Sequence, residues 1–123
     1  METQQIVMES VPIKDEKPEI QIISPSDVRM KLDRGEGVML LDIREAHDLN
    51  GPLGHLEGIK HIPLQSLSLR LKELEQYRDK LVITICRGGS LAYIAAEILL
   101  LAGFPHVAVL EGGMVGWRLT YRP

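Results

Sequence analysis

A short apolar run, residues 81–85, ends at Cys86 and leads into a glycine-containing loop at residues 87–90. A pattern with helical spacing follows at once over residues 91–102, and Gly103 suits its C-terminal cap. This order predicts a buried strand, a tight turn and a helix, which is the unit from which parallel α/β sheets are built. The predicted helix has few polar residues, and we expect it to pack on most of its sides.

Three further apolar runs have the length and composition of strands. They lie at residues 20–22, 38–42 and 107–110. Segments with helical signals separate the predicted strands, so neighbouring strands should run in the same direction. The predicted fold class is therefore α/β, with a central parallel β-sheet flanked by helices.

Two other segments carry helix signals. Ser24 is a candidate N-cap with Pro25 in the first turn, and Val28 and Leu32 are expected to form the buried side of that helix. A second predicted helical face consists of leucines: Leu67, Leu71 and Leu74. Residues 45–63 contain several glycine and proline breakers, and we predict that they are mostly loop.

The distribution of charge divides the chain of 123 residues into two parts. Residues 1–19 hold five acidic and two basic side chains without a clear period, which predicts a polar, acidic N-terminal arm. Residues 20–123 hold twelve side chains of each sign and form the predicted domain. Neither part has a basic stripe, so we do not expect nucleic acid as a partner.

Cys86 is the only cysteine, so the chain cannot form an internal disulfide. A lone thiol fits a reducing compartment, and we expect a cytoplasmic location. The sequence shows no signal-peptide pattern at its start and no apolar stretch long enough to span a bilayer, so no membrane association is expected. The histidines lack ligand spacing with the lone cysteine, and we expect no metal or other cofactor.

The sulfur of Cys86 is predicted to lie where loop amides and the N-terminus of a helix converge. Such a place favours negative charge and therefore the thiolate, which is the nucleophilic form of cysteine. The alternative is an inert thiol at the end of a buried strand, because free cysteines are often core residues.

Four stretches of the sequence, in this order, form a recognisable pattern. Residues 41–45 contain D-x-R-E, and residues 54–64 contain G-H-x-x-G followed by I-P. The third stretch is the loop at residues 86–91, and the fourth, residues 103–117, contains G-F, then L-E-G-G, and ends in tryptophan. Together they resemble the rhodanese domain family over about residues 22–118.

The resemblance implies an α/β domain that moves sulfane sulfur. Cys86 would take sulfur from a small-molecule donor such as thiosulfate, or from a protein persulfide, and pass it on from its own persulfide. The residues after Cys86 are implied to form an anion-binding loop: Arg87, Gly88, Gly89, Ser90 and Leu91. Backbone amides in such a loop can hold a negatively charged sulfur. Because no second cysteine can resolve the persulfide, the acceptor must be an external thiol or another thiophile.

Other residues of the pattern are expected to support the site. We expect Asp42 and Arg44, at the end of a predicted strand, to connect neighbouring loops by ion pairing and hydrogen bonds. His55 is expected to order its loop rather than to act as a base, because the cysteine loop itself would stabilise the thiolate. Trp117 is expected to pack, and residues 112–113 are interpreted as a turn.

Two features depart from the family pattern. The sixth loop residue is usually arginine or threonine but is Leu91 here, which favours a less charged donor, or a weakly active or inactive module that binds a protein partner. The segment of residues 42–54 is also about two residues longer than usual. A phosphatase is a third alternative, but its loop needs an arginine where this chain has Ala92.

Overall fold

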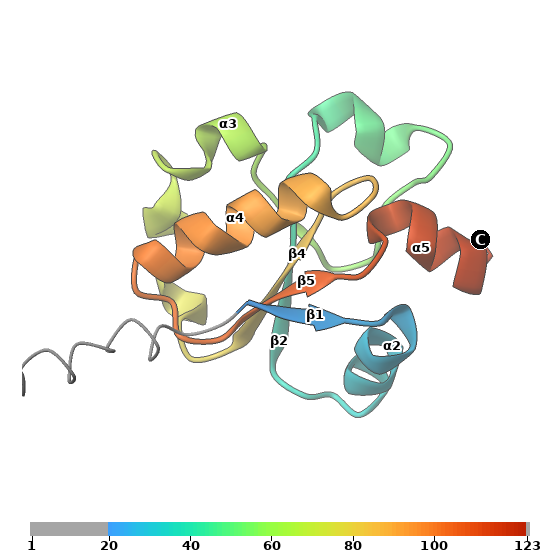
Figure 1. Ribbon diagram of the computed structural model, residues 1–123, viewed down its shortest axis with the longest axis horizontal. Coiled ribbons are helices and arrows are strands. Elements are labelled where there is room, and N and C mark those ends of the chain that lie inside the picture. The colour runs from blue at the N-terminus through green and yellow to red at the C-terminus, as the bar shows by residue number, and fades with distance from the viewer. Residues whose placement is uncertain (1–19, 123) are drawn as a thin grey trace, which may run out of the picture.

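A single parallel sheet organises the part of the chain that the structure describes. The computed structural model describes residues 20–122, so the predicted arm at residues 1–19 lies outside the described residues. Every pair of neighbouring strands is parallel, and the order is β1-β5-β4-β2-β3 (Figure 1). The strands are β1 (Gln21–Ile23), β2 (Val38–Asp42), β3 (Lys60–His61), β4 (Leu81–Ile85) and β5 (Val107–Leu110). The predicted α/β fold class is confirmed.

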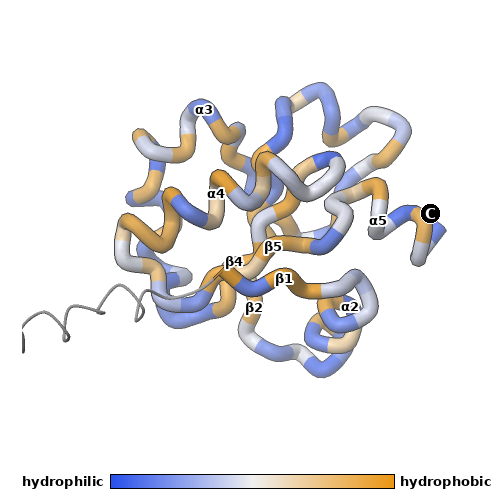
Figure 2. Tube along the Cα trace, viewed as in Figure 1, coloured by the Kyte–Doolittle hydropathy of each residue, from blue (hydrophilic) through white to orange (hydrophobic). Residues whose placement is uncertain are grey.

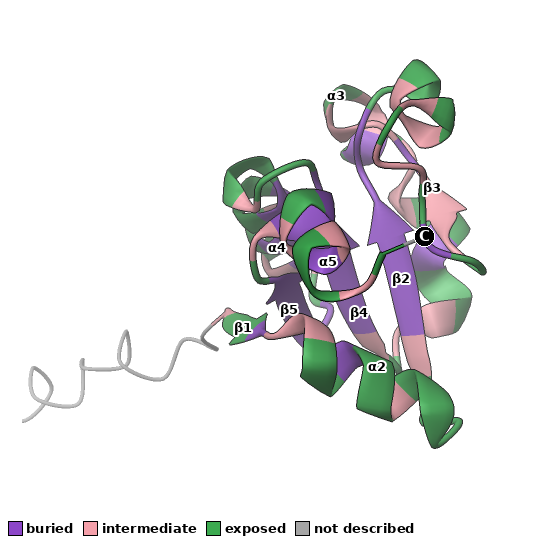
Figure 3. Cartoon of the chain, turned by 90° about the vertical axis from the view of Figure 1, so that its right-hand side faces the viewer, coloured by how far each residue is buried: buried purple, intermediate pink, exposed green. Residues whose placement is uncertain are grey.

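Helices cover both faces of this sheet. One face carries α2 (Pro25–Asp33) and α5 (Gly113–Thr120), and the other carries α3 (Leu64–Leu67), η3 (Leu71–Tyr77) and α4 (Ser90–Leu101). Figure 1 shows α3 and α4 above the strands and α2 below them. Most of β2 and β4 is buried between these layers, as Figure 3 shows in purple. The described residues thus form two hydrophobic clusters, one on each side of the sheet.

The apolar run of β4 is nearly continuous because both of its faces are buried. Val82 and Cys86 belong to the cluster under α4, whereas Ile83 and Ile85 belong to the cluster under α2 and α5. This alternation is the normal period of a strand, whose successive side chains point to opposite faces. Figure 2 shows hydrophobic colour along both β4 and β5. The side chain of Cys86 therefore lies on the α4 side of the sheet.

Helix α2 begins as predicted. The hydroxyl of Ser24 accepts a hydrogen bond of 3.1 Å from the backbone N–H of Asp27, and Pro25 occupies the first helical position. The prediction for Leu32 is wrong, because its side chain is exposed and only Val28 is buried in this helix. A helix on the outside of a sheet buries one narrow stripe, and Leu32 falls beside that stripe.

The prediction that the helix after Cys86 packs on most of its sides is also wrong. Its buried residues lie on one face: Ala92, Ala95, Ala96 and Leu99. Leu91, Ile94 and Leu101 are exposed, because only one face of α4 meets the sheet. With 12 residues α4 is the longest described helix, and no helix in the described part is long and apolar enough to cross a membrane.

The segment between β2 and β4 has more structure than predicted. The leucine face that was predicted as one helix is divided between α3 and η3. Between them the chain forms tighter, 3₁₀-type turns, in which the N–H of Leu69 donates to the carbonyl of Ser66 at 3.1 Å and the N–H of Arg70 donates to the carbonyl of Leu67 at 3.0 Å. The predicted loop at residues 45–63 contains the 3₁₀-helix η2 (Ala46–Asn50) and the two-residue strand β3. Neither element is long enough to give a hydrophobic period.

Candidate active site

Cys86 lies directly after β4, one of the inner strands of the sheet. Its side chain is 2% exposed and joins the hydrophobic cluster under α4. The neighbouring strands β2 and β5 hold β4 on both sides over most of its length. The carboxyl end of an inner strand in an open parallel sheet is where ligand sites of α/β proteins commonly form. The fold therefore presents the only thiol of the chain at this edge.

A tight loop brings a backbone donor to the sulfur. The N–H of Gly89 donates a hydrogen bond of 2.9 Å to Cys86 Sγ. Gly89 adopts φ +108° and immediately precedes α4, a backbone conformation that favours glycine. The first N–H groups of α4 have no partner within the helix, and the helix dipole is positive at this end. Both features favour a negatively charged sulfur.

The loop residues that are predicted to bind an anion differ in how far they are exposed to solvent. Arg87, Gly88, Ser90 and Leu91 are exposed, and Gly89 is partly buried. Arg87 is the only charged side chain of the loop. Anion binding by these residues stays a prediction.

The N-terminus of α5 holds the cysteine loop from the other side. The N–H of Met114 donates to the carbonyl of Cys86 at 2.9 Å, and the N–H of Val115 donates to the carbonyl of Arg87 at 3.0 Å. A Cβ on Gly113 would lie 2.5 Å from the Cys86 oxygen and 2.6 Å from the Arg87 oxygen. The predicted turn at residues 112–113 is confirmed only for Gly112, which precedes α5 with φ +73°, whereas Gly113, with φ +57°, is already the first residue of α5.

The additional role of Gly113 in placing the cysteine loop was not predicted. The only local signal is a pair of glycines directly after an apolar strand. The contact itself joins segments more than twenty residues apart in the chain. Sequence periodicity carries no information about such a contact.

Thr84 fixes the start of α4 to the sheet. Its buried hydroxyl donates a hydrogen bond of 2.8 Å to the carbonyl of Ala92, in the first turn of the helix. A threonine within an otherwise apolar run is a detectable signal, because a buried hydroxyl needs a partner. This bond holds the helix N-terminus in place over Cys86.

Asp42 and Arg44 form a buried ion pair at the end of β2. Arg44 Nη2 lies 2.8 Å from Asp42 Oδ2, and Arg44 Nε donates to Oδ1 at 2.9 Å. The same guanidinium donates to the carbonyl of Gly54 at 2.7 Å. Its charge is therefore neutralised by the carboxylate, and its donors hold the loop that follows β2.

His55 contacts the same loop and makes no described hydrogen bond to Cys86. Its Nδ1 bonds the carbonyl of Leu49 at 2.8 Å. A second histidine, His61, bonds the carbonyl of Arg44 at 2.7 Å and was not predicted to contribute. Arg118 of α5 donates to the carbonyl of Leu53 at 2.8 Å, which joins this loop to the helix that clamps the cysteine loop.

The predicted site residues thus fall into two neighbouring groups. One group is the loop of Cys86, and the other is the ion pair with the loop that Arg44 holds. Asp42 is the register partner of Ile85, the residue before Cys86. The N–H of Ile43 also donates to the carbonyl of Ile85 at 2.9 Å. The ion pair is therefore one strand away from the thiol and supports the backbone beside it.

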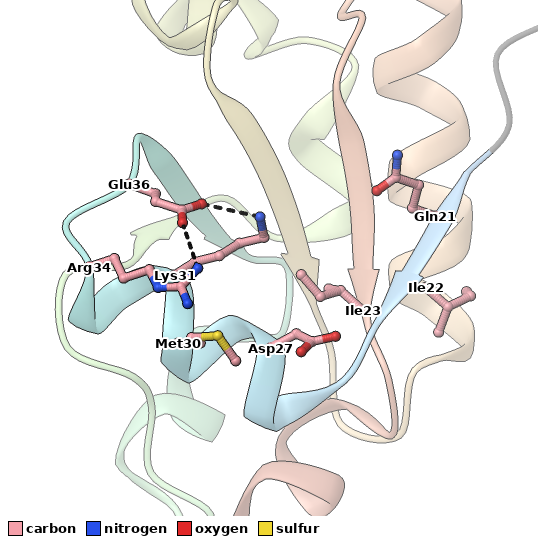
Figure 4. A pocket seen from close by; sticks show the side chains of 8 residues that line it. All are labelled: Gln21, Ile22, Ile23, Asp27, Met30, Lys31, Arg34 and Glu36. Carbon is pink, nitrogen blue, oxygen red and sulfur yellow. Dashed lines mark hydrogen bonds and ion pairs between the residues drawn. The ribbon is translucent and has the colours of Figure 1, made fainter.

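The residues that the structure describes include no group of three or more histidine, cysteine or acidic side chains able to hold a metal ion. A pocket of about 380 Å³ lies elsewhere, between β1 and α2 (Figure 4). Its charged side chains neutralise one another, since Lys31 and Arg34 lie 3.2 and 3.7 Å from the carboxylate of Glu36. None of the residues that line this pocket belongs to the loop of Cys86.

Together, the fold and the site define a small parallel α/β domain with a buried thiol in a loop at the N-terminus of a helix. Residues 24–120 match the rhodanese-like domain family, and the chain belongs to that family. The resemblance inferred from the sequence is thereby confirmed.

Individual relatives agree with this assignment. The chain is 28% identical over 95 residues to a sulfurtransferase from Allochromatium vinosum, covering 77% of this chain and 85% of that protein. It is 29% identical over 97 residues to the thiosulfate sulfurtransferase GlpE from Pseudomonas putida, covering 79% and 84%. Among solved structures, a rhodanese-related protein from Thermoplasma volcanium matches with a TM-score of 0.73, 28% identity and coverage of 84% and 95%.

Proposed function

We propose that this protein is a sulfurtransferase that carries sulfane sulfur on Cys86. The observation that carries this proposal is the hydrogen bond of 2.9 Å from Gly89 N–H to Cys86 Sγ at the N-terminus of α4. An amide donor and a helix dipole at one sulfur stabilise both a thiolate and the terminal sulfur of a persulfide. The family's sulfurtransferase members support the same reaction class.

The proposed reaction has two displacement steps. The Cys86 thiolate attacks the sulfane sulfur of the donor, a new S–S bond forms, and the donor's own bond to that sulfur breaks. With thiosulfate the leaving group is sulfite, and Cys86 becomes a persulfide. An acceptor thiolate or cyanide then attacks the outer sulfur, and the bonding pair returns to Cys86 as a thiolate.

The acceptor in this proposal comes from outside the chain. Cys86 is the only cysteine, so no second thiol of the same molecule can displace the persulfide as an intramolecular disulfide. The outer sulfur must therefore be reached by a thiophile from solvent or on another protein. Because Cys86 is almost fully buried, that thiophile has to approach along the exposed loop.

A second candidate function is a binding module with little or no catalytic activity. The exposed side chain of Leu91 beside the loop favours this alternative, because it provides an apolar contact for a protein partner. A phosphatase is disfavoured. The position that would need an anion-clamping arginine is Ala92, which lies in the first turn of α4 and is fully buried against the sheet.

Thiocyanate formation from cyanide tests the proposal. We expect turnover with thiosulfate or with an organic persulfide, and loss of that turnover to the uncatalysed background in Cys86→Ser. Ser68→Ala, at an exposed serine outside the loop, is the matched control and should keep full activity. Equal activity of Cys86→Ser and the parent would contradict the proposal, as would the absence of turnover with both donors. The thermal unfolding of Cys86→Ser shows whether its fold is intact.

A further inference from the structure

Exposed apolar side chains lie on both helices that hold the cysteine loop. Leu91, in the first turn of α4, is 51% exposed, and Val115, in the first turn of α5, is also exposed. Val115 is fixed beside the loop by its N–H bond to the Arg87 carbonyl. Figure 1 shows both helices starting at the same edge of the sheet, where β4 and β5 end.

Positive charge is scarce at this edge. Arg87 is the only cation of the loop, and the Arg44 guanidinium is buried against Asp42. Arg118 directs its Nε to the carbonyl of Leu53. Within the described part of the chain, one exposed cation is therefore the only charged side chain that the loop itself offers to an incoming anion.

Such surroundings offer little to stabilise the charge of a small dianion such as thiosulfate. The sulfonate end of thiosulfate lies beyond its transferable sulfur, so it would be at the mouth of the loop while Cys86 attacks. Placing it against an apolar side chain removes water without supplying a partner for its charge. An organic group in the same place would instead remove apolar surface from water, which is favourable.

We propose that Leu91 determines donor specificity and that Cys86 takes sulfur from organic persulfides with an apolar group next to the S–S bond in preference to thiosulfate. This inference rests on the proposed sulfur transfer by Cys86 and specifies its donor class. Leu91 acts by contact with the organic group of the donor, and the backbone of the loop holds the transferred sulfur.

The transfer step balances without an added oxidant or reductant. The Cys86 thiolate attacks the terminal sulfur of R–S–SH, and a new S–S bond forms. The S–S bond of the donor breaks, and R–S⁻ leaves with its electron pair. The terminal sulfur remains on Cys86 together with its proton, as Cys86–S–SH.

Two substitutions on α4 test the inference. Leu91→Arg places a cation at the loop, and Leu101→Arg makes the same change at a side chain that is 89% exposed on the same helix. The two positions are ten residues apart, roughly 15 Å along a helix. The probes are thiosulfate, benzyl persulfide and 2-hydroxyethyl persulfide, and the measurement is the rate at which each loads Cys86.

We expect the parent protein to load from benzyl persulfide faster than from 2-hydroxyethyl persulfide. In Leu91→Arg the ratio of thiosulfate to benzyl persulfide rates should rise by about tenfold, the size of one added charge-assisted contact. Leu101→Arg should leave the ratio unchanged. Leu91→Ser, which removes the apolar group without adding charge, should abolish the preference for the benzyl donor. Comparing each ratio between the parent and a variant cancels the different intrinsic reactivities of the donors.

The outcomes separate this inference from the proposed function. Loading by all three donors with ratios that Leu91→Arg and Leu91→Ser leave unchanged would overturn the role of Leu91 and keep Cys86 as carrier. An equal change of the ratio in Leu101→Arg would attribute it to net charge and would overturn the inference as well. Absence of loading by every donor would overturn the proposed function itself.

Discussion

A Cβ at position 113 would lie 2.5 Å from the carbonyl oxygen of Cys86, so α5 and the cysteine loop can meet as they do only where residue 113 is glycine. This close approach lets the first N–H groups of α5 bond the carbonyls of the loop. The carbonyls are thereby turned toward α5, and the N–H of Gly89 is left free to face the sulfur. The geometry of the thiol thus depends on a glycine that is distant in sequence.

Gly113→Ala should therefore lower both stability and the rate of sulfur loading. We expect a loss of about 2–4 kcal/mol in the free energy of unfolding, from the strain at positive φ together with the clash. Gly35→Ala is the matched control, because its φ is +68° and nothing lies within 4 Å of the added Cβ. It should cost only about 1 kcal/mol. Equal losses in urea unfolding would show that the contact with the loop contributes nothing.

The buried ion pair of Asp42 and Arg44 should contribute more to stability than an exposed ion pair does. Asp42→Asn leaves the Arg44 guanidinium buried without its counter-charge and should cost about 3–5 kcal/mol of stability. Asp33→Asn removes one partner of the exposed ion pair between Arg29 and Asp33, whose side chains are 50% and 69% exposed. That change should cost less than about 1 kcal/mol. Urea unfolding of both variants decides the question, and a small loss in Asp42→Asn would contradict the structural importance of the pair.

Thr84→Val keeps the shape of the side chain and removes its hydroxyl. The carbonyl of Ala92 then loses the donor at 2.8 Å, and we expect a loss of about 1–2 kcal/mol. Thr120 bonds the carbonyl of Gly116 at 3.0 Å but is exposed, so Thr120→Val should change stability by less than about 0.5 kcal/mol. Calorimetry on both variants provides the comparison. A neutral Thr84→Val would mean that this bond does not fix the start of α4.

The pair of Glu75 and Arg78 predicts a pH effect at η3. Hydrogen bonding from the Arg78 guanidinium, at 2.6 Å, lowers the pKa of Glu75 from its ordinary value. A lowered pKa in the folded state stabilises the protein above the unfolded-state pKa, and this contribution disappears as pH falls through the folded-state pKa. An NMR titration should find the pKa of Glu75 higher in Arg78→Gln than in the parent.

The pair of Glu73 and Arg70 serves as an internal reference for this titration. Arg70 lowers the pKa of Glu73 in the same way, and Arg78→Gln does not touch that pair. Glu73 should therefore titrate identically in the two proteins. If Glu75 also titrates identically, the ion pair of Arg78 is absent in solution.

The sequence predicted the inner strands and the helix after Cys86, because buried parallel strands are continuous apolar runs that end at turn residues. It also predicted the N-cap of α2 at Ser24, because capping is a local hydrogen bond. The strand β3 escaped prediction, since two residues cannot show a period. The exposure of Leu91 escaped it as well, because apolar composition does not reveal which side of a helix meets the sheet.

For the site, the sequence predicted the thiol and its loop but not what holds the loop in place. The contributions of Gly113 and His61 come from contacts between separate elements, and these depend on the order of the strands. Neither the hydrophobic period of a segment nor its charge depends on the order of the strands, so neither can predict these contacts. Asp42 and Arg44 were easier to recognise, because a carboxylate and an arginine two residues apart can pair locally.

Intact-mass spectrometry of the reduced protein, after incubation with thiosulfate or with benzyl persulfide, tests the central claim most directly. Because Cys86 is the only cysteine, a gain of one sulfur atom can be assigned to it through Cys86→Ala. The account predicts a gain of about 32 Da with at least one donor, removed by cyanide and absent in Cys86→Ala. No mass gain with either donor, or an equal gain in Cys86→Ala, would contradict sulfur transfer through this thiol.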